Sequence, residues 1–248
     1  MHLIKMWLEA PVEETDEQGN THRSTRNRDE GRGTPQGAPI SPLLSNLYMR
    51  RFVLGWKTLG YETRLCAYIV NYADDLVICC RSGADKAAAV MRSLMEKLKL
   101  TVNEAKTRVC LAPDEKFDFL GYTFGRCFSP ETGRGYIGTV PSKKRIQRVC
   151  AAISAETGQT KTLLDDAEVV QTLNRIMVGW ANYFCLGPVS KAYRAVERHA
   201  RKRLRQWLCA KHKLDWPATK CYPEAALHEV LGLVCLTKRT SSFPWAKP

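Results

Sequence analysis

The sequence NYADDLVICC, residues 71–80, places two adjacent aspartates between two short apolar runs. These runs, 65–70 before the aspartates and 76–80 after them, are too short for helices and fit β-strands. Asp is a common turn residue, so the pair is compatible with an ordinary solvated hairpin turn. A tight turn also brings two negative charges together at its tip, where a bound cation relieves their repulsion. At this point the sequence leaves both interpretations open.

The stretch GTPQG, residues 33–37, lies just before a strongly signalled helix. Ser41 is predicted as the N-cap of this helix, Pro42 as its first residue and Gly60 as its end. The two glycines of GTPQG allow close backbone approach, and a helix N-terminus favours anions such as nucleotide phosphates. Mg²⁺ binds one or two carboxylates and leaves its other positions to water and phosphate. The two features together favour metal-dependent nucleotidyl transfer.

The remaining pattern changes along the chain from mixed α and β to nearly all helical. We expect a helix over 2–10, a polar hairpin centred on Gly19 and Asn20, a helix over 83–103, strands over 107–112 and 117–124, and helices over 142–157, 166–184 and 190–213. No internal repeat interrupts this order.

The charge of the chain, +13 over 248 residues, is unevenly placed. Residues 1–138 carry 19 Lys and Arg against 17 Asp and Glu, whereas residues 139–248 carry 19 against 8. Aromatic residues are interleaved with the second set of cations, which is typical of a polyanion-binding surface. A helical surface that is merely solvated usually mixes both signs. The second part is therefore predicted to bind nucleic acid.

Several other classes of protein are disfavoured by the sequence. No stretch approaches the roughly 18 apolar residues of a membrane span, and the N-terminus lacks the order of a signal peptide, so we expect a cytoplasmic protein without membrane contact. The ten cysteines form no Cys-x-x-Cys pair and are predicted to be small buried hydrophobic residues rather than metal ligands or disulfide partners. Cys209, His212, Cys221 and His228 offer an alternative zinc site, but their spacing fits no common finger.

Five short blocks resemble, in order and spacing, those of the reverse transcriptases encoded by group II introns. GTPQGAPISPLLSNLYM and YIVNYADDLVICC resemble motifs B and C, LKLTVNEAKTRV the block after them, FDFLGYTF the block that grips the primer end, and LNRIMVGWANYF the thumb or maturase domain. The resemblance implies an α+β fold. A right-hand polymerase palm, with a partial antiparallel sheet and helices, would span residues 1–138, and a basic α-helical thumb would span 139–248.

The resemblance also implies a role for particular residues. Asp74 would ligate catalytic Mg²⁺, and Asp75 would support the same site. The nucleotide and template pocket would contain Gln36, Gly37, Tyr72, Ala73 and Lys106; the primer grip would be formed by Leu120 and Gly121; and RNA phosphates would be bound by Lys143, Lys144, Arg145, Arg198, Arg201, Lys202, Arg203 and Arg205. Lys106 fits equally well as a surface lysine that closes a turn, and Gly121 fits nearly as well as a buried strand glycine.

One element of the family pattern is absent from this sequence. The family supplies a further metal-binding aspartate from motif A, on an apolar strand upstream of motif B, and no such strand precedes residue 33 here. We therefore expect the C-terminal portion of such an enzyme, with an incomplete palm and a whole thumb, that copies RNA poorly or not at all alone. The expected partners are intron RNA, an RNA/DNA duplex, dNTPs and an upstream fragment that supplies the fingers and motif A.

Three functions remain compatible with the sequence. The first is an RNA-directed DNA polymerase of the group II intron type that also assists intron splicing as a maturase. The second is an RNA-binding maturase remnant without polymerase activity. The third is a non-functional product of a broken mobile element.

Overall fold

The computed structural model describes residues 2–15, 19–25, 29, 38–129, 131–214 and 218–239. The chain divides into two compact units, Met1–Val109 and Cys110–Pro248. Helices combine with two-, two- and three-stranded antiparallel sheets, which confirms the predicted α+β class. Over the part of the chain that is described, the helices lack the combination of length and apolar character that a membrane span requires.

The first unit begins with a short helix and a hairpin. Helix α1 (His2–Glu9) ends before Pro11, as predicted, because proline disfavours helical geometry in the residue before it. Strands β1 (Val12–Thr15) and β2 (Thr21–Ser24) pair antiparallel, which confirms the hairpin expected around Gly19 and Asn20.

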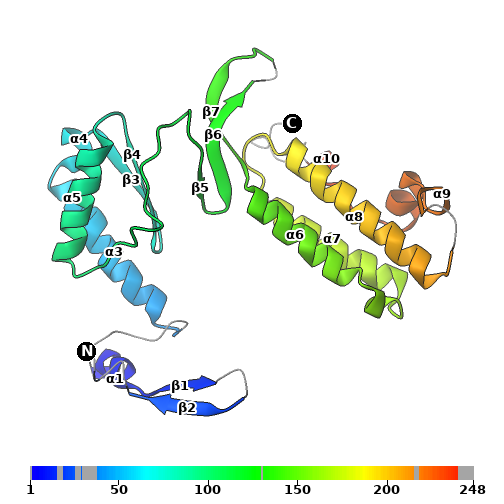
Figure 1. Cartoon of the computed structure of the whole chain (residues 1–248), viewed down its shortest axis with the longest axis horizontal. Coiled ribbons are helices and arrows are strands. Elements are labelled where there is room, and N and C mark those ends of the chain that lie inside the picture. Colours follow the sequence, from blue (N-terminus) through cyan, green and yellow to red (C-terminus); the bar gives the residue numbers. More distant parts are fainter. Residues whose placement is uncertain are drawn as a thin grey trace. The chain divides into compact units, whose positions relative to one another are not determined.

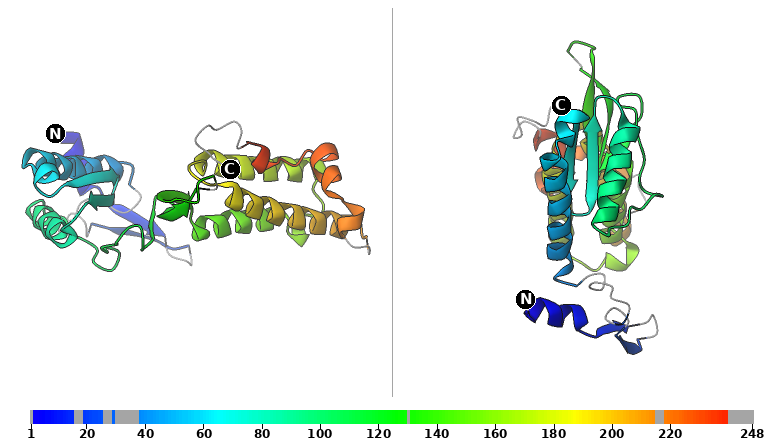
Figure 2. Two further views of the ribbon diagram at one scale, coloured as in Figure 1. Left: turned by 90° about the horizontal axis from the view of Figure 1, so that it is seen from above. Right: turned by 90° about the vertical axis from the view of Figure 1, so that its left-hand side faces the viewer.

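The rest of the first unit packs two helices against a second hairpin (Figure 1). Helix α3 (Ser41–Thr58) and the short α4 (Tyr61–Arg64) precede β3 (Ala67–Tyr72), β4 (Asp75–Cys80) and α5 (Ala84–Lys97). Figure 2 shows α3 and α5 alongside the β3–β4 hairpin. Their contact buries an apolar cluster that includes Phe52, Trp56 and Met91. The Trp56 indole donates a hydrogen bond of 2.9 Å to the carbonyl of Ala67, which joins α3 to the start of β3.

The helix boundaries correct two predictions. Ile40, not Ser41, is the N-cap of α3, because the Leu44 amide already bonds to the Ile40 carbonyl at 3.1 Å. Gly60, at φ 73°, follows the end of α3 as predicted. Helix α5 ends at Lys97, well short of residue 103. There Lys99 adopts φ 57° and the amide of residue 100 bonds back to the carbonyl of residue 95, a common way of closing a helix.

The strand predicted over 107–112 is wrong. This segment pairs with no strand in the described part of the chain. The Leu111 amide instead donates to the Glu115 carboxylate at 2.9 Å, and the Glu115 amide donates to the Leu111 carbonyl at 2.8 Å. This local turn replaces the ladder that a strand would need.

The second unit starts with a three-stranded sheet in the order β5–β6–β7. The predicted single strand over 117–124 is instead two strands, β5 (Phe117–Phe119) and β6 (Tyr122–Phe128), which are joined by a two-residue turn. The third strand, β7 (Gly135–Pro141), was not predicted from the sequence.

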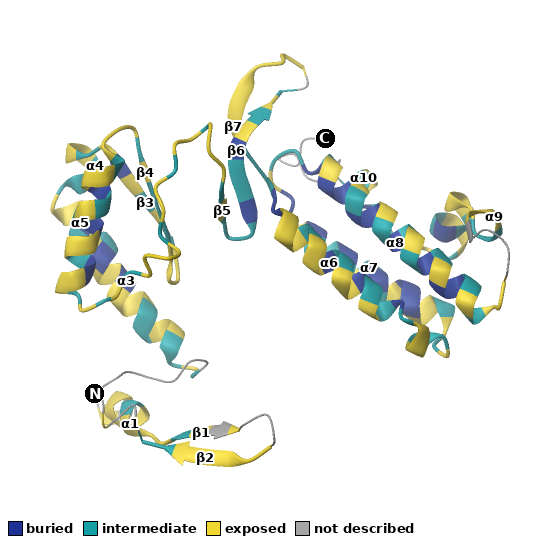
Figure 3. Cartoon of the chain, viewed as in Figure 1, coloured by how far each residue is buried: buried dark blue, intermediate teal, exposed yellow. Residues whose placement is uncertain are grey.

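Three long helices form the core of the second unit. They are α6 (Lys143–Glu156), α7 (Asp166–Tyr183) and α8 (Ser190–Lys211), which confirms the predicted helices to within two residues at each end. The short elements η1 (Gln159–Lys161), α9 (Ala218–Cys221), the π-helical η2 (Ala226–Val230) and α10 (Leu236–Arg239) complete the unit. Figure 3 shows the buried stripes of the long helices, which hold residues such as Leu173, Met177 and Leu204.

Candidate active site and nucleic-acid interface

The β3–β4 turn determines where the two aspartates lie. Tyr72 pairs with Asp75, so that Ala73 and Asp74 alone form the turn. Ala73 has a φ of 53°, the left-handed conformation that a tight two-residue hairpin turn requires. The Asn71 side-chain amide donates to the carbonyls of Ala73 (2.8 Å) and Asp75 (3.3 Å). These bonds fix the backbone from which both carboxylates project.

Both carboxylates are exposed at the tip of the hairpin. Within the residues that the structure describes, neither Asp74 nor Asp75 has a side-chain hydrogen bond or ion pair. Their oxygens are the hard donors that Mg²⁺ prefers, so the donor type fits this ion. Across the same described ranges, no cluster of three or more His, Cys, Asp or Glu side chains is present. The pair therefore supplies only part of a metal coordination shell.

An exposed face of β3 continues from the aspartates. Tyr68, Val70 and Tyr72 alternate with inward-facing residues and are 61%, 50% and 65% exposed. Because Asp75 lies directly opposite Tyr72 on β4, its carboxylate shares this face. Exposed aromatic rings offer flat bases a surface to stack on, whereas the carboxylate beside them repels a phosphate backbone unless a cation is bound between them.

Three other residues were predicted for the nucleotide pocket, and the structure describes one of them. Gln36 and Gly37 lie outside the described residues. Lys106 is exposed in a turn after α5, where its amide bonds to the Asn103 carbonyl at 3.0 Å. Its ammonium group makes no hydrogen bond or ion pair with either aspartate among the described contacts.

The predicted primer grip, Leu120 and Gly121, is the turn between β5 and β6. Their φ values are 51° and 85°, so both residues are left-handed. A Cβ added to Gly121 would lie 2.9 Å from the Arg145 Nε and 3.2 Å from the Phe184 ring. Glycine is therefore needed here both for its conformation and for the close approach of neighbouring side chains.

Two tyrosines fasten this turn to the long helices. The Tyr183 hydroxyl donates to the Leu120 carbonyl at 3.0 Å, and the Tyr122 hydroxyl donates to the Tyr183 carbonyl at 2.6 Å. The Ser142 amide donates to the Gly121 carbonyl at 2.9 Å. Burial raises the pKa of the Tyr122 hydroxyl, which keeps it protonated as a donor. The sequence resemblance did not identify Tyr183 as part of this arrangement.

Five of the eight predicted RNA-binding cations point to solvent. Lys143, Lys144 and Arg145 are exposed at the start of α6, and Arg198 and Lys202 are exposed on α8. Positive charges at a helix N-terminus oppose the helix dipole. The cations at the start of α6 therefore do not stabilise their own helix. Their use as RNA contacts remains a prediction.

The other three predicted cations make internal contacts. Arg203 donates to the carbonyls of Thr157 at 2.8 Å and Ser154 at 3.3 Å, where α6 ends. Arg205 donates to the Tyr222 carbonyl at 2.8 Å. Arg201 pairs with the carboxylate of Glu224. Their use as RNA contacts remains a prediction, but each guanidinium already has a partner inside the protein.

The basic face of α8 extends further than the sequence reasoning proposed. Lys191 and Arg194 are exposed about two turns and one turn, respectively, before Arg198. The helical period of 3.6 residues places these side chains near Arg198 and Lys202, so the period itself could have identified them.

The alternative zinc site is not assembled in the described residues, since no group of three or more potential ligands is present there. The His228 ring is hydrogen-bonded to the Leu233 carbonyl at 2.7 Å, and the His212 ring lies 3.4 Å from the Asp166 carboxylate. All ten cysteines are free thiols, but only Cys185 is buried, so the prediction that they are small buried side chains is wrong for the others.

Two comparisons with protein families agree with this geometry. The family described as reverse transcriptase (RNA-dependent DNA polymerase) matches residues 1–124, which include the aspartate hairpin. The family described as group II intron, maturase-specific domain matches residues 146–222, which include most of α6 and all of α7 and α8. Among curated proteins, no sequence matches the chain.

The match over half of the chain shows that this protein belongs to the reverse transcriptase family. The maturase-specific domain that follows it identifies the type: the chain is a group II intron reverse transcriptase and maturase. Nucleic acids such as intron RNA are the partners of this family, and reverse transcriptases generally use divalent metal ions.

Proposed function

We propose that the β3–β4 hairpin is the catalytic turn of a polymerase palm and that α6, α7 and α8 form its thumb. The observation that carries the proposal is the pair Asp74 and Asp75, held at the two-residue turn and at the first residue of β4, with no side-chain partner within the described residues. A structural carboxylate pair would be neutralised by nearby cations, whereas a metal-binding pair must keep its oxygens available.

In this function Asp74 and Asp75 hold Mg²⁺. When bound there, the ion would supply positive charge to the attacking and leaving oxygens of nucleotidyl transfer. The chain itself positions the reactants: Asn71 fixes the turn, and Tyr72 and Ala73 form the surface beneath the primer end. The backbone of the Leu120–Gly121 turn approaches the primer strand.

Because the described residues bring no third ligand to the pair, we propose that a partner segment carrying motif A supplies a further carboxylate. The surface of the first unit supports such a partner segment. Leu43, Leu47 and Leu54 on α3 are 54%, 50% and 46% exposed. In the described part of the chain, the β3–β4 sheet has only two strands, so each strand keeps one unpaired edge. Apolar faces and free edges of this kind favour pairing with a further strand.

Primer extension on an RNA template with Mg²⁺ tests this function. The protein, Asp74→Asn and Asp85→Asn are each assayed alone and with a polypeptide that supplies the fingers and motif A. Asp85 is an exposed aspartate on α5, so its variant controls for the loss of one charge. We expect extension with the added polypeptide, at least about a 100-fold loss in Asp74→Asn, because small errors in such sites cost this much, and no change in Asp85→Asn.

The second candidate function is an RNA-binding maturase without polymerase activity. The exposed cations of α6 and α8 favour it, because they need no metal site. In that case neither the unmodified protein nor its variants extend the primer, with or without the added polypeptide. All of them bind RNA, and Asp74→Asn binds it with unchanged affinity. Activity of the protein alone that is lost in Asp74→Asn would contradict the need for an outside carboxylate.

A further inference from the structure

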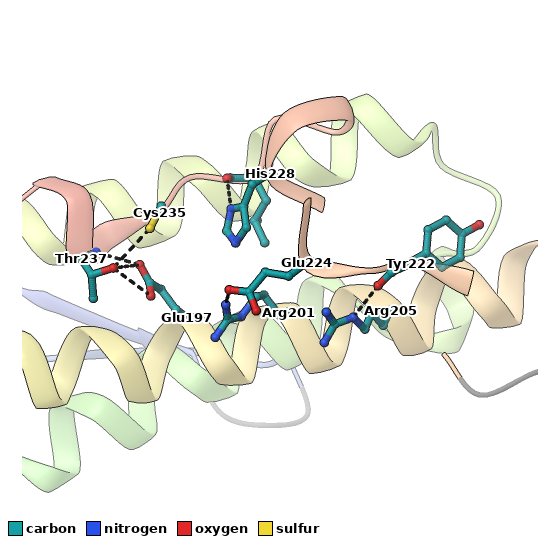
Figure 4. A network of polar contacts seen from close by, with 9 residues as sticks. Glu197, Arg201, Arg205, Tyr222, Glu224, His228, Cys235 and Thr237 are labelled. Atoms are coloured by element: carbon teal, nitrogen blue, oxygen red, sulfur yellow. Dashed lines mark hydrogen bonds and ion pairs between the residues drawn. The ribbon is translucent and has the colours of Figure 1, made fainter. Parts of the chain in front are cut away.

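The segment that follows α8 folds back on it and occupies two of its arginines (Figure 4). The Glu224 carboxylate pairs with Arg201, and the Tyr222 carbonyl accepts a hydrogen bond of 2.8 Å from the Arg205 Nε. The Arg201 side chain is 20% exposed, whereas that of Glu224 is 62% exposed. The ion pair is therefore open to solvent on the side of the carboxylate.

Arg201 belongs to a continuous row of arginines on α8. Arg194, Arg198, Arg201 and Arg205 are spaced by four, three and four residues, which places them along one face of the helix. Arg198, one turn before Arg201, is exposed and has no described partner. A polyanion that follows this face from Arg194 to Arg198 reaches Arg201 next.

Arg201 and Arg205 have different kinds of partner. Burial lowers the pKa of Arg205, and the neighbouring charge of Arg201 lowers it further. The Glu224 carboxylate pairs with Arg201, whereas the Arg205 Nε donates to the Tyr222 carbonyl and has no ion pair among the described contacts. The buried Glu197 carboxylate, four residues before Arg201, accepts hydrogen bonds from Thr237 instead. A phosphate that replaces the Glu224 carboxylate on Arg201 keeps that guanidinium paired and gains the nearby charge of Arg205.

We propose that Glu224 occupies the place of an RNA phosphate on Arg201 and is displaced when RNA binds along α8. This inference rests on the proposed RNA binding by α8. Glu224 then acts as a specificity-determining residue. An RNA that places a phosphate at Arg201 gains the phosphate–guanidinium contact. A polyanion that does not reach Arg201 leaves the Glu224 carboxylate in place and is repelled by it.

The test compares two substitutions that remove the same charge from the same segment. Glu224→Gln frees Arg201, whereas Glu229→Gln changes an exposed residue that has no described partner. The dissociation constant of a short double-stranded RNA is measured over a series of KCl concentrations. An exposed ion pair is worth little, so Glu224→Gln is expected to tighten binding about two- to fivefold. The log–log salt slope should stay the same, because Arg201 contacts a phosphate in both complexes. A slope steeper by roughly 0.7–0.9, which corresponds to one more phosphate contact, would show that RNA does not displace Glu224 in the unmodified protein and would overturn the inference.

Glu229→Gln should tighten binding less and leave the slope unchanged. In the Arg201→Ala background, Glu224→Gln should lose its effect, because the contact it releases no longer exists. Equal effects of the two substitutions, or an undiminished effect of Glu224→Gln without Arg201, would overturn the inference. RNA binding by the unmodified protein that does not respond to salt would overturn the proposed RNA surface as well.

A third variant guards against a loss of folding. If Glu224→Gln lowers the melting temperature, Glu224→Asp keeps the charge but shortens the side chain, so that it reaches Arg201 less well. Tighter RNA binding by Glu224→Asp supports displacement of a contact. Unchanged binding by this variant counts against it, because bulk charge alone would then explain the result.

Discussion

Replacing Arg203 with alanine is expected to destabilise the second unit. Its guanidinium donates to the Thr157 carbonyl (2.8 Å), the Ser154 carbonyl (3.3 Å) and the Thr157 hydroxyl (3.1 Å). The last carbonyls of a helix lack intrahelical donors and carry partial negative charge. The Arg203 guanidinium supplies hydrogen-bond donors and a positive charge to the carbonyls at the end of α6. By sequence alone, Arg203 resembles the exposed cations around it on α8.

The size of the effect follows from these three bonds. A hydrogen bond to a charged group contributes about 1.5–3 kcal/mol. Three bonds from one guanidinium at a partly solvated helix end are not additive. We therefore expect the free energy of unfolding to fall by about 2–4 kcal/mol. In a protein of 248 residues each kcal/mol lowers the Tm by about 2–4 °C. The Tm of Arg203→Ala should therefore fall by roughly 5–15 °C.

Thermal unfolding followed by far-UV circular dichroism measures this change, and Lys202→Ala is the matched control. Lys202 is adjacent in sequence, exposed and without a described partner, so its loss should change stability by less than about 0.5 kcal/mol. Lys202→Ala should instead weaken RNA binding. Equal melting temperatures for the two variants, with an equal loss of RNA affinity, would refute the structural role of Arg203.

Two further predictions concern the same unit. Gly187→Ala should lower the Tm by several degrees, because Gly187 has φ 75° and an added Cβ would collide with the Thr139 carbonyl oxygen. The control is Gly179→Ala on α7, where an added Cβ would meet open space. Its Tm should be unchanged or higher. Burial lowers the pKa of His199 below its usual value of about 6.5, and the charge of Arg203 lowers it further. The unfolded chain therefore takes up this proton first, so stability should be full above pH 6.5 and decline as the pH falls toward the folded-state pKa. Melting curves from pH 7.5 to 5.5 should show a shallower decline for His199→Gln than for the unmodified protein.

The sequence predicted the elements whose signals are local. The aspartate hairpin follows from two apolar runs that a short polar pair separates, and the three long helices follow from their apolar period. The turn at Leu120 was missed because leucine rarely adopts a positive φ, and only the contacts of the helices hold it there. Strand β7 carries few apolar residues, so its place depends on pairing with β6.

The internal use of some cations could not be predicted from the sequence. Arg198, Arg201 and Arg205 look alike in sequence because all three recur with the same helical period. Their environments differ because the chain after α8 returns to contact only part of that face. Tertiary contact between distant segments, not local pattern, separates a free cation from a paired one.

The tyrosine link between the β5–β6 turn and the helices has a consequence for how the protein can be divided. Tyr122 and Tyr183 bond across about 60 residues of chain, and the sheet that carries the turn belongs to the compact unit that starts at Cys110. Exchanging the maturase helices between two such proteins at residues 138 and 139 would cut through β7 and leave the turn with the wrong partner. An exchange between residues 109 and 110 would transfer the turn, its two tyrosines and the helices together, because they all belong to the unit that starts at Cys110.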